Sequence, residues 1–195
     1  MTDTPAPFHV ITGGPGSGKS TLIDALEKAG FARTVEAGRA IIQDQVAIDG
    51  PALPWRDPML FAELMLSWEM RSYRAAARRA GPVFFDRGVP DVIGYLVMLG
   101  RPVPPHMERA AAKLRYDRVF VAPPWPEIFT RDAERRQDFD EAVRTCEAMM
   151  ITYRRLGYTP IALPRAAVAE RLRFVLDTLG MATPLAAQEG PKAPC

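Results

Sequence analysis

Two patterns of hydrophobic and polar positions alternate along the chain. Short apolar runs rich in Val, Ile and Phe, each followed by a turn or a helix-start signal, predict β-strands. Longer stretches with helical periodicity separate these runs and predict helices. The predicted strands are Phe8–Thr12, Arg33–Val35, Val83–Phe85, Arg118–Ala122 and Thr159–Leu163. The predicted helices are Lys19–Ala29, Arg39–Ile48, Pro58–Arg79, Pro90–Leu99, Pro105–Leu114, Asp138–Leu156 and Ala166–Leu179.

This alternation is typical of an α/β domain in which helices cover both faces of a parallel sheet. Prolines in three predicted first turns and glycines after several predicted helix ends support the boundaries. We expect one domain over residues 1–180. Residues 181–195 are rich in Ala, Pro and Gly and lack periodicity, so we expect a flexible C-terminal tail there.

Composition narrows the class of protein. Of the 195 residues, 48% are hydrophobic and 25% are charged, which provides for a core and argues against global disorder. The net charge of +2 is too small to indicate a nucleic-acid partner. No apolar run approaches the roughly 20 residues that span a bilayer, and Met1–Phe8 lacks the features of a secretion signal. With only two cysteines, the sequence predicts a cytoplasmic protein without a disulfide framework.

The segment Gly13–Ser20 fits the phosphate-binding pattern G-x-x-x-x-G-K-[ST] in full, between an apolar strand and a helix. Glycines let backbone N–H groups surround phosphate oxygens, and the helix N-terminus adds a positive dipole. Lys19 is expected to reach the β- and γ-phosphates, and Ser20 to bind Mg²⁺. The alternative is a glycine-rich turn without a ligand. The predicted nucleotide-binding residues are Gly13, Gly14, Pro15, Gly16, Ser17, Gly18, Lys19, Ser20 and Thr21.

A second candidate group follows the apolar run Val83–Phe85. P-loop proteins place an acid at the end of a strand near the metal, and Asp86 is the residue that fits, because the strand at Arg118–Ala122 ends without an acid. Asp86 and Ser20 are therefore the predicted Mg²⁺ ligands. Arg87 is expected to point into the crevice at the carboxyl ends of the strands. The alternatives are a turn-capping aspartate and an arginine in a surface ion pair.

Glu36 is expected to end the second strand and so to lie at the ligand-binding edge of the sheet. A carboxylate at that edge can accept a proton from an attacking hydroxyl or hold the substrate. The alternative is a salt bridge at the N-terminus of the following helix.

Arginines gather after the fourth predicted strand, where small phosphotransferases carry a lid. Arg131, Arg135 and Arg136 lie in this segment, and we expect a lid over about residues 124–138. Cations that arrive when such a site closes can stabilise the charge on a transferred phosphoryl group. The alternative is a solvated helix whose arginines pair with neighbouring acids.

Five segments together resemble the small P-loop AAA-domain ATPases related to the kinase domain of NadR. The resemblance covers about Phe8 to Leu179, nearly the whole chain. The segments are Gly13–Thr21, Glu36–Ile42, Phe84–Gly88, Ala122–Glu127 and Ala133–Gln137.

The resemblance implies a three-layer P-loop fold with the sheet order 2-3-1-4-5, and ATP or GTP used with Mg²⁺. Deoxynucleoside kinases are similar at a greater distance. Their catalytic glutamate, acid–arginine pair and lid arginines correspond in position to Glu36, to Asp86 with Arg87, and to the arginine-rich segment. One residue departs from that pattern, because Gly88 stands where those kinases usually carry serine.

Together these features predict a P-loop phosphotransferase. It would transfer the γ-phosphoryl group of Mg-ATP to a small metabolite such as a nucleoside or riboside. The predicted catalytic residues are Lys19, Glu36, Asp86, Arg87, Arg131, Arg135 and Arg136. The alternative function is a nucleotide-dependent switch, an ATPase or GTPase whose lid engages a partner protein or a lipid.

Overall fold

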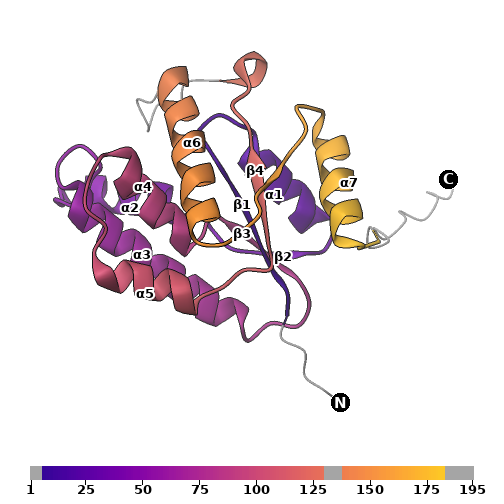
Figure 1. Cartoon of the computed structure of the whole chain (residues 1–195), viewed down its shortest axis with the longest axis horizontal. Helices are drawn as coiled ribbons and strands as arrows, with labels where there is room; N and C mark the ends of the chain where they lie inside the picture. The colour runs from indigo at the N-terminus through magenta and orange to yellow at the C-terminus, as the bar shows by residue number, and fades with distance from the viewer. Residues whose placement is uncertain (1–5, 130–137, 183–195) are drawn as a thin grey trace, which may run out of the picture.

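Five parallel strands form one sheet in the order β2-β3-β1-β4-β5 (Figure 1). The computed structural model describes residues 6–129 and 138–182. The strands are β1 Phe8–Gly13, β2 Ala32–Arg33, β3 Val83–Asp86, β4 Arg118–Ala122 and β5 Ile161–Ala162. The helices are α1 Lys19–Lys28, α2 Ala37–Ala47, α3 Pro58–Ala76, α4 Val89–Met98, α5 Pro105–Lys113, α6 Phe139–Arg155 and α7 Val168–Leu179, with a short 3₁₀ helix η1 at Pro126–Ile128.

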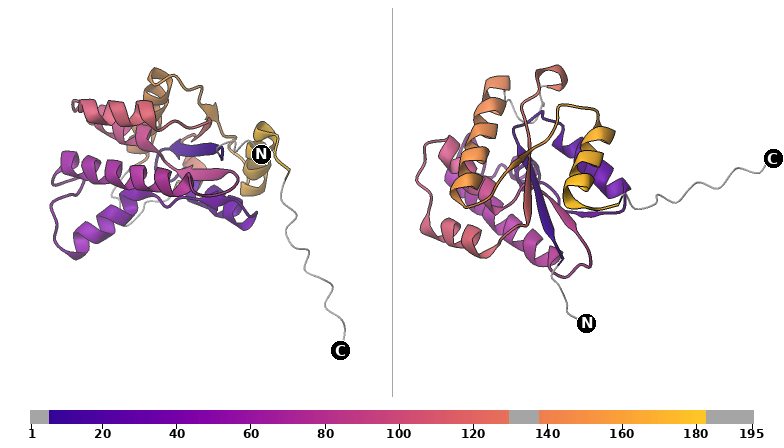
Figure 2. Two further views of the ribbon diagram at one scale, coloured as in Figure 1. Left: turned by 90° about the horizontal axis from the view of Figure 1, so that it is seen from below. Right: turned by 45° about the vertical axis from the view of Figure 1, so that its right-hand side comes forward.

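Helices cover both faces of the sheet. Figure 2 shows α6 on one side of the strands and α7 on the other. Side chains of α1 and α7 form one core with the sheet, and side chains of α3 and α6 form another with the opposite face. Side chains of α2, α3, α4 and α5 form a third apolar cluster. Through α4, which contacts α6, this cluster lies next to the core on the α6 side of the sheet. The structure thus has the three layers that the resemblance implied, and the sheet order is confirmed.

The alternation of side chains along β3 shows how the sequence builds these layers. Val83 and Phe85 enter the core under α3 and α6, whereas Phe84 enters the core under α1 and α7. All three are buried completely or almost completely. Because both faces are covered, every position of the strand can be apolar, which explains the continuous apolar run in the sequence.

The second strand is shorter than predicted and lies earlier. It pairs with β3 only through Ala32 and Arg33, and Thr34 still donates its N–H to the carbonyl oxygen of Phe84. The backbone N–H of Asp86 then donates to the hydroxyl of Thr34 at 3.2 Å, where a further backbone carbonyl would continue the ladder. The prediction that Glu36 ends this strand is therefore wrong. Glu36 instead occupies the N-cap position of α2.

Within the described residues, no helix is long and apolar enough to cross a membrane. The predicted lid is described only in part. Its beginning contains η1, and its three arginines, Arg131, Arg135 and Arg136, lie outside the described residues.

Candidate active site

The phosphate-binding motif occupies the turn between β1 and α1. Gly18 is the N-cap of α1, with a left-handed φ of 74°. The Nζ of Lys19 donates to the carbonyl oxygen of Gly14 at 2.5 Å and to the hydroxyl of Ser17 at 3.4 Å. The Ser17 hydroxyl donates to the same carbonyl at 2.8 Å. The loop is thus folded around its own lysine at a helix N-terminus, which is a favourable position for an anion.

Backbone from two other elements approaches this loop closely. A Cβ atom on Gly13 would collide with the carbonyl oxygen of Ala122 at the end of β4. A Cβ atom on Gly14 would collide with the carbonyl oxygen of Ala142 in α6. Glycine at these two positions therefore lets the loop pack between the ends of β4 and α6.

Arg171 of α7 supports the loop from the other face of the sheet. It is 3% exposed, and its Nη1 donates to the carbonyl oxygens of Ser17 at 3.1 Å and Gly18 at 3.4 Å. Its Nε and Nη2 have no hydrogen-bond partner among the described residues. Burial lowers the pKa of this guanidinium. Arg171 could not be predicted as a site residue from the sequence, because no local motif marks a buried arginine on a charged helix.

Arg87 follows β3 directly and connects Glu36 with the phosphate-binding loop. Its Nε donates to Glu36 Oε1 at 3.1 Å, and its Nη1 donates to the carbonyl oxygen of Gly13 at 3.0 Å. Burial favours a lower pKa for Arg87, but the carboxylates of Glu36 and Asp91 outweigh it and raise the pKa. Its φ of 71° is rare for a residue with a Cβ, and such strain is concentrated at functional sites. Glu36 therefore fits both interpretations of the sequence. It forms an ion pair at the N-terminus of α2, and it lies beside the phosphate-binding loop.

Asp91 of α4 is the centre of a buried hydrogen-bond network and is not among the residues predicted from the sequence. Its carboxylate accepts from Arg87 Nη1 at 3.3 Å, from the Gly88 N–H at 3.0 Å and from the Tyr153 hydroxyl at 2.6 Å. The Thr12 hydroxyl also donates to it. Asp91 therefore ties β1, the end of β3 and α6 together. An acid three residues after a helix-capping glycine was the available signal.

Asp86 ends β3 and is 5% exposed. In the pairing of β1 with β3 it is opposite Ile11, two residues before the phosphate-binding loop. Hydroxyl and carboxylate oxygens are the ligands that Mg²⁺ prefers. Ser20 at the start of α1 and Asp86 at the end of the neighbouring strand are thus a donor set that fits Mg²⁺.

A cavity of about 340 Å³ opens beside the loop, a volume typical of small-molecule sites. We call it the α3–α4 cavity. Pro15, Glu36 and Arg87 line one part of it, next to the phosphate-binding loop. The rest is largely apolar and aromatic, lined by Ile42, Trp55, Phe61, Met65, Val92, Tyr95, Met98 and Leu99, among others. The same cavity therefore contains the predicted catalytic carboxylate of Glu36 and an apolar, aromatic surface that suits a planar ring.

Glu69 of α3 and Tyr95 of α4 line the same cavity. Glu69 is 2% exposed, and burial together with the carboxylates of Asp91 and Asp86 raises its pKa well above the usual range. Burial and the nearby Glu141 raise the pKa of Tyr95 to about 12. The sequence held a signal for Glu69, since this acid falls on the apolar stripe of its helix with Ala62 and Leu66.

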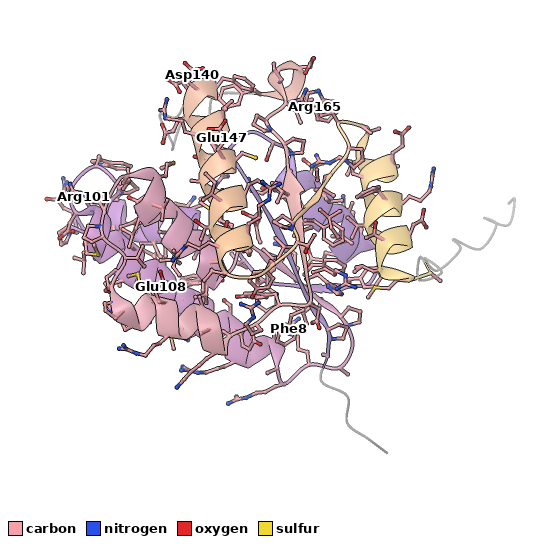
Figure 3. The ribbon with its side chains drawn as sticks, in the orientation of Figure 1. Phe8, Arg101, Glu108, Asp140, Glu147 and Arg165 are labelled. Atoms are coloured by element: carbon pink, nitrogen blue, oxygen red, sulfur yellow. The ribbon has the colours of Figure 1, made fainter. Side chains whose placement is uncertain are left out.

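The ends of several elements meet at this side of the sheet. In Figure 3, Phe8 marks the start of β1, and Asp140 and Arg165 lie at the opposite end of the molecule. Asp140 is in the first turn of α6, and Arg165 is in the segment that leads into α7. The carboxyl edge of the sheet, where ligands bind in open α/β folds, is thus bordered by α6 and by the segment before α7.

The sheet order and the phosphate-binding loop together define a P-loop fold of the kinase type. A family model described as "AAA domain" matches residues 8–171, and the chain belongs to this family. The comparison with curated proteins gives no match.

Solved structures share the fold at low sequence identity. NadR in complex with NR has a TM-score of 0.69 and 18% identity, over 91% of this chain and 51% of NadR, so the chain spans about half of that protein. Deoxyadenosine kinase from M. mycoides, with the products dCMP and dCDP bound, has a TM-score of 0.64 and 14% identity, over 89% of this chain and 98% of the kinase. Thymidylate kinase from Ehrlichia chaffeensis has a TM-score of 0.62 and 13% identity, over 90% of this chain and all of the kinase.

Proposed function

We propose that the chain transfers the γ-phosphoryl group of ATP or GTP to a hydroxyl of a nucleoside or riboside. One observation carries this proposal. Pro15 of the phosphate-binding loop, Glu36 and several aromatic side chains all line the α3–α4 cavity. An acceptor whose ring lies among those side chains would bring a hydroxyl toward Glu36 and the loop. The kinases of similar fold, whose names refer to nucleosides and nucleotides, support this class of acceptor.

Three groups of residues would bind the phosphates, the metal ion and the transferred phosphoryl group. Lys19 and the backbone N–H groups of the non-proline residues in Gly13–Thr21 would hold the phosphates of the nucleotide. Ser20 and Asp86 would hold Mg²⁺, which neutralises charge on the β- and γ-phosphates. From the lid, Arg131, Arg135 and Arg136 would place positive charge close to the transferred phosphoryl group.

Glu36 would act as the base. The acceptor oxygen forms a bond to the γ-phosphorus while the bond between that phosphorus and the β–γ bridging oxygen breaks. The hydroxyl proton passes to the Glu36 carboxylate, and the electron pair of the broken bond stays on the nucleoside diphosphate. Arg87 holds Glu36 through Nε and the loop through Nη1, so its contacts support a positioning role.

Replacement of the base tests the proposal. In Glu36→Gln we expect acceptor-dependent ADP formation to fall about 100-fold or more, because a general base contributes on that order. Nucleotide affinity, measured by calorimetry, should change little. The matched control is Glu63→Gln, since Glu63 is a partly exposed acid of α3 paired with His106.

Two outcomes would contradict the proposal. Equal turnover in Glu36→Gln and the wild type would show that Glu36 is not the base. Tight nucleotide binding without transfer to any nucleoside or riboside would favour the nucleotide-dependent switch.

A further inference from the structure

A second cavity lies against β2, α2 and α3, outside the candidate active site. Its volume is about 580 Å³, which is within the range of small-molecule sites. None of the described residues lines both this cavity and the α3–α4 cavity. Ile41 and Trp68 line the second cavity, whereas the next residue of each helix, Ile42 or Glu69, lines the first. We call the second one the β2 cavity.

Apolar side chains form much of the lining of the β2 cavity. Ile41 of α2 and Val83 of β3 are buried core residues that reach it. Leu64 and Trp68 of α3 are half-buried and leave part of their surface open to it. An indole beside aliphatic side chains offers a flat ring a large contact area. The cavity therefore suits a ligand with a flat apolar body.

The charged residues that line the β2 cavity are mostly cationic. Arg33 of β2 pairs with Glu27 of α1, with 2.8 Å between Nε and Oε2. Arg71 and Arg79 are exposed, and within residues 6–129 and 138–182 neither side chain has an ion pair or a hydrogen bond. Asp44 is the acid among the described lining residues. Two arginines without a counter-charge thus outweigh one carboxylate, and this balance favours an anion.

Trp68, Arg71 and Ser72 bring the apolar and cationic features together on one helix. All three belong to α3 and line the cavity. Residues three and four positions apart are neighbours on a helix surface, so Arg71 and Ser72 both lie one turn from Trp68. A ring placed against Trp68 would therefore carry its substituent next to an arginine and a hydroxyl.

We propose that the β2 cavity binds a small organic anion, with a flat apolar body against Trp68 and an anionic group on Arg71. An arginine side chain donates two parallel, charge-assisted hydrogen bonds to a group with two or three anionic oxygens. The occupant would also contact Thr34, whose hydroxyl accepts the N–H of Asp86 at 3.2 Å. The site thus borders the segment that leads to Glu36. Binding there does not depend on the proposed phosphoryl transfer.

A matched pair of probes tests the proposal. Naphthalene-1-sulfonate and naphthalene-1-sulfonamide share one ring system, and the first carries a negative charge. Calorimetry on the full chain should show that the sulfonate binds about fivefold or more tightly, because its hydrogen bonds to arginine are charge-assisted. Added salt should narrow the difference, since salt screens exposed charges. The difference should persist in Lys19→Ala, which separates this site from the phosphate-binding loop.

Replacement of the arginine tests the anionic contact. In Arg71→Gln we expect affinity for the sulfonate to fall about fivefold and affinity for the sulfonamide to stay the same, because the variant loses the cation and keeps the length of the side chain. The matched control is Arg74→Gln, since Arg74 is an exposed arginine of the same helix that does not line the cavity.

Filling the cavity tests the place of binding. Ala75 is an exposed residue of the lining, so Ala75→Phe adds a ring there without entering the core. We expect it to weaken both probes about tenfold, because the ring occupies the space of the ligand. Ala77→Phe is the control, because Ala77 is exposed at the end of α3 and does not line the cavity.

The proposal is overturned if neither probe binds, or if the sulfonamide binds as tightly as the sulfonate. It is also overturned if Arg74→Gln weakens the sulfonate as much as Arg71→Gln does, or if Ala75→Phe leaves the affinity for both probes unchanged. None of these results depends on ADP formation, so they are distinct from failure of the proposed function.

Discussion

Gly88 lies against the ring of Tyr116, and this contact explains the glycine that departs from the kinase pattern. A Cβ atom at Gly88 would lie 2.8 Å from Tyr116 Cζ and 2.9 Å from its hydroxyl oxygen. That ring is buried against Tyr73 and Phe85, and its hydroxyl accepts the N–H of Val89 at 3.1 Å. The serine that deoxynucleoside kinases usually carry does not fit here without movement of the tyrosine.

We therefore expect Gly88→Ser to lower the free energy of unfolding by about 1–3 kcal/mol, the usual cost of an overpacked site. Urea denaturation followed by circular dichroism measures it. Gly38→Ser is the control, because a Cβ there meets other atoms only at ordinary contact distances of 3.8 Å or more. If the two variants are equally stable, the contact with Tyr116 does not explain Gly88.

At the scale of single residues, the sequence predicts the site residues that belong to one local motif. The phosphate-binding loop is contiguous, so its residues and their backbone roles could be predicted together. The contact between Gly88 and Tyr116, or between Asp91 and Tyr153, joins residues 28 and 62 positions apart. Such partners follow from the packing of α4 and the residue before it against α6 and against the segment between α5 and β4, and no spacing rule in the sequence contains them.

At the scale of whole elements, helix α7 supports the phosphate-binding loop, a role that its amphipathic pattern does not predict. Arg171 in its first turns donates to the carbonyl oxygens of Ser17 and Gly18, and a Cβ at Gly18 would lie 2.6 Å from Arg171 Nη1. The guanidinium thus occupies the space that a side chain at position 18 would need, and it fixes the turn that begins α1.

Replacing this guanidinium should weaken the loop. In Arg171→Met we expect nucleotide affinity to fall about tenfold, and unfolding free energy to fall by about 1–3 kcal/mol, because two carbonyl oxygens lose a buried donor. Calorimetry and chemical denaturation measure the two effects. Arg173→Met is the matched control, since Arg173 is an exposed residue of the same helix. Unchanged nucleotide affinity in Arg171→Met would show that the loop holds its shape without α7.

The elements themselves were predicted well where hydrophobic periodicity decides them. Each predicted helix is present, and α3 and α5 begin at the predicted prolines. The second strand was placed too late, because its end depends on the Thr34 hydroxyl that receives the N–H of Asp86 from the neighbouring strand. That error also displaced Glu36, which belongs to the start of α2.

For the whole molecule, the sheet order could not be derived from the hydrophobic pattern, which gives the strands without their neighbours. The order came from the resemblance, and the structure confirms it. The order matters because it places β3 beside β1, so that Asp86 and Arg87 lie next to the phosphate-binding loop. The α3–α4 cavity is likewise a property of the assembled fold, since α2, α3, α4 and α6 all contribute to its lining.

Nucleotide binding is the claim on which the proposed chemistry depends. Calorimetric titration of the folded protein with ATP and with GTP, each with Mg²⁺, tests it most directly. The account predicts binding of at least one of them, and a loss of about 100-fold or more in Lys19→Ala, because the lysine is expected to hold the β- and γ-phosphates. Folded wild-type protein that binds neither nucleotide, or a Lys19→Ala variant that binds as tightly as the wild type, would contradict the account.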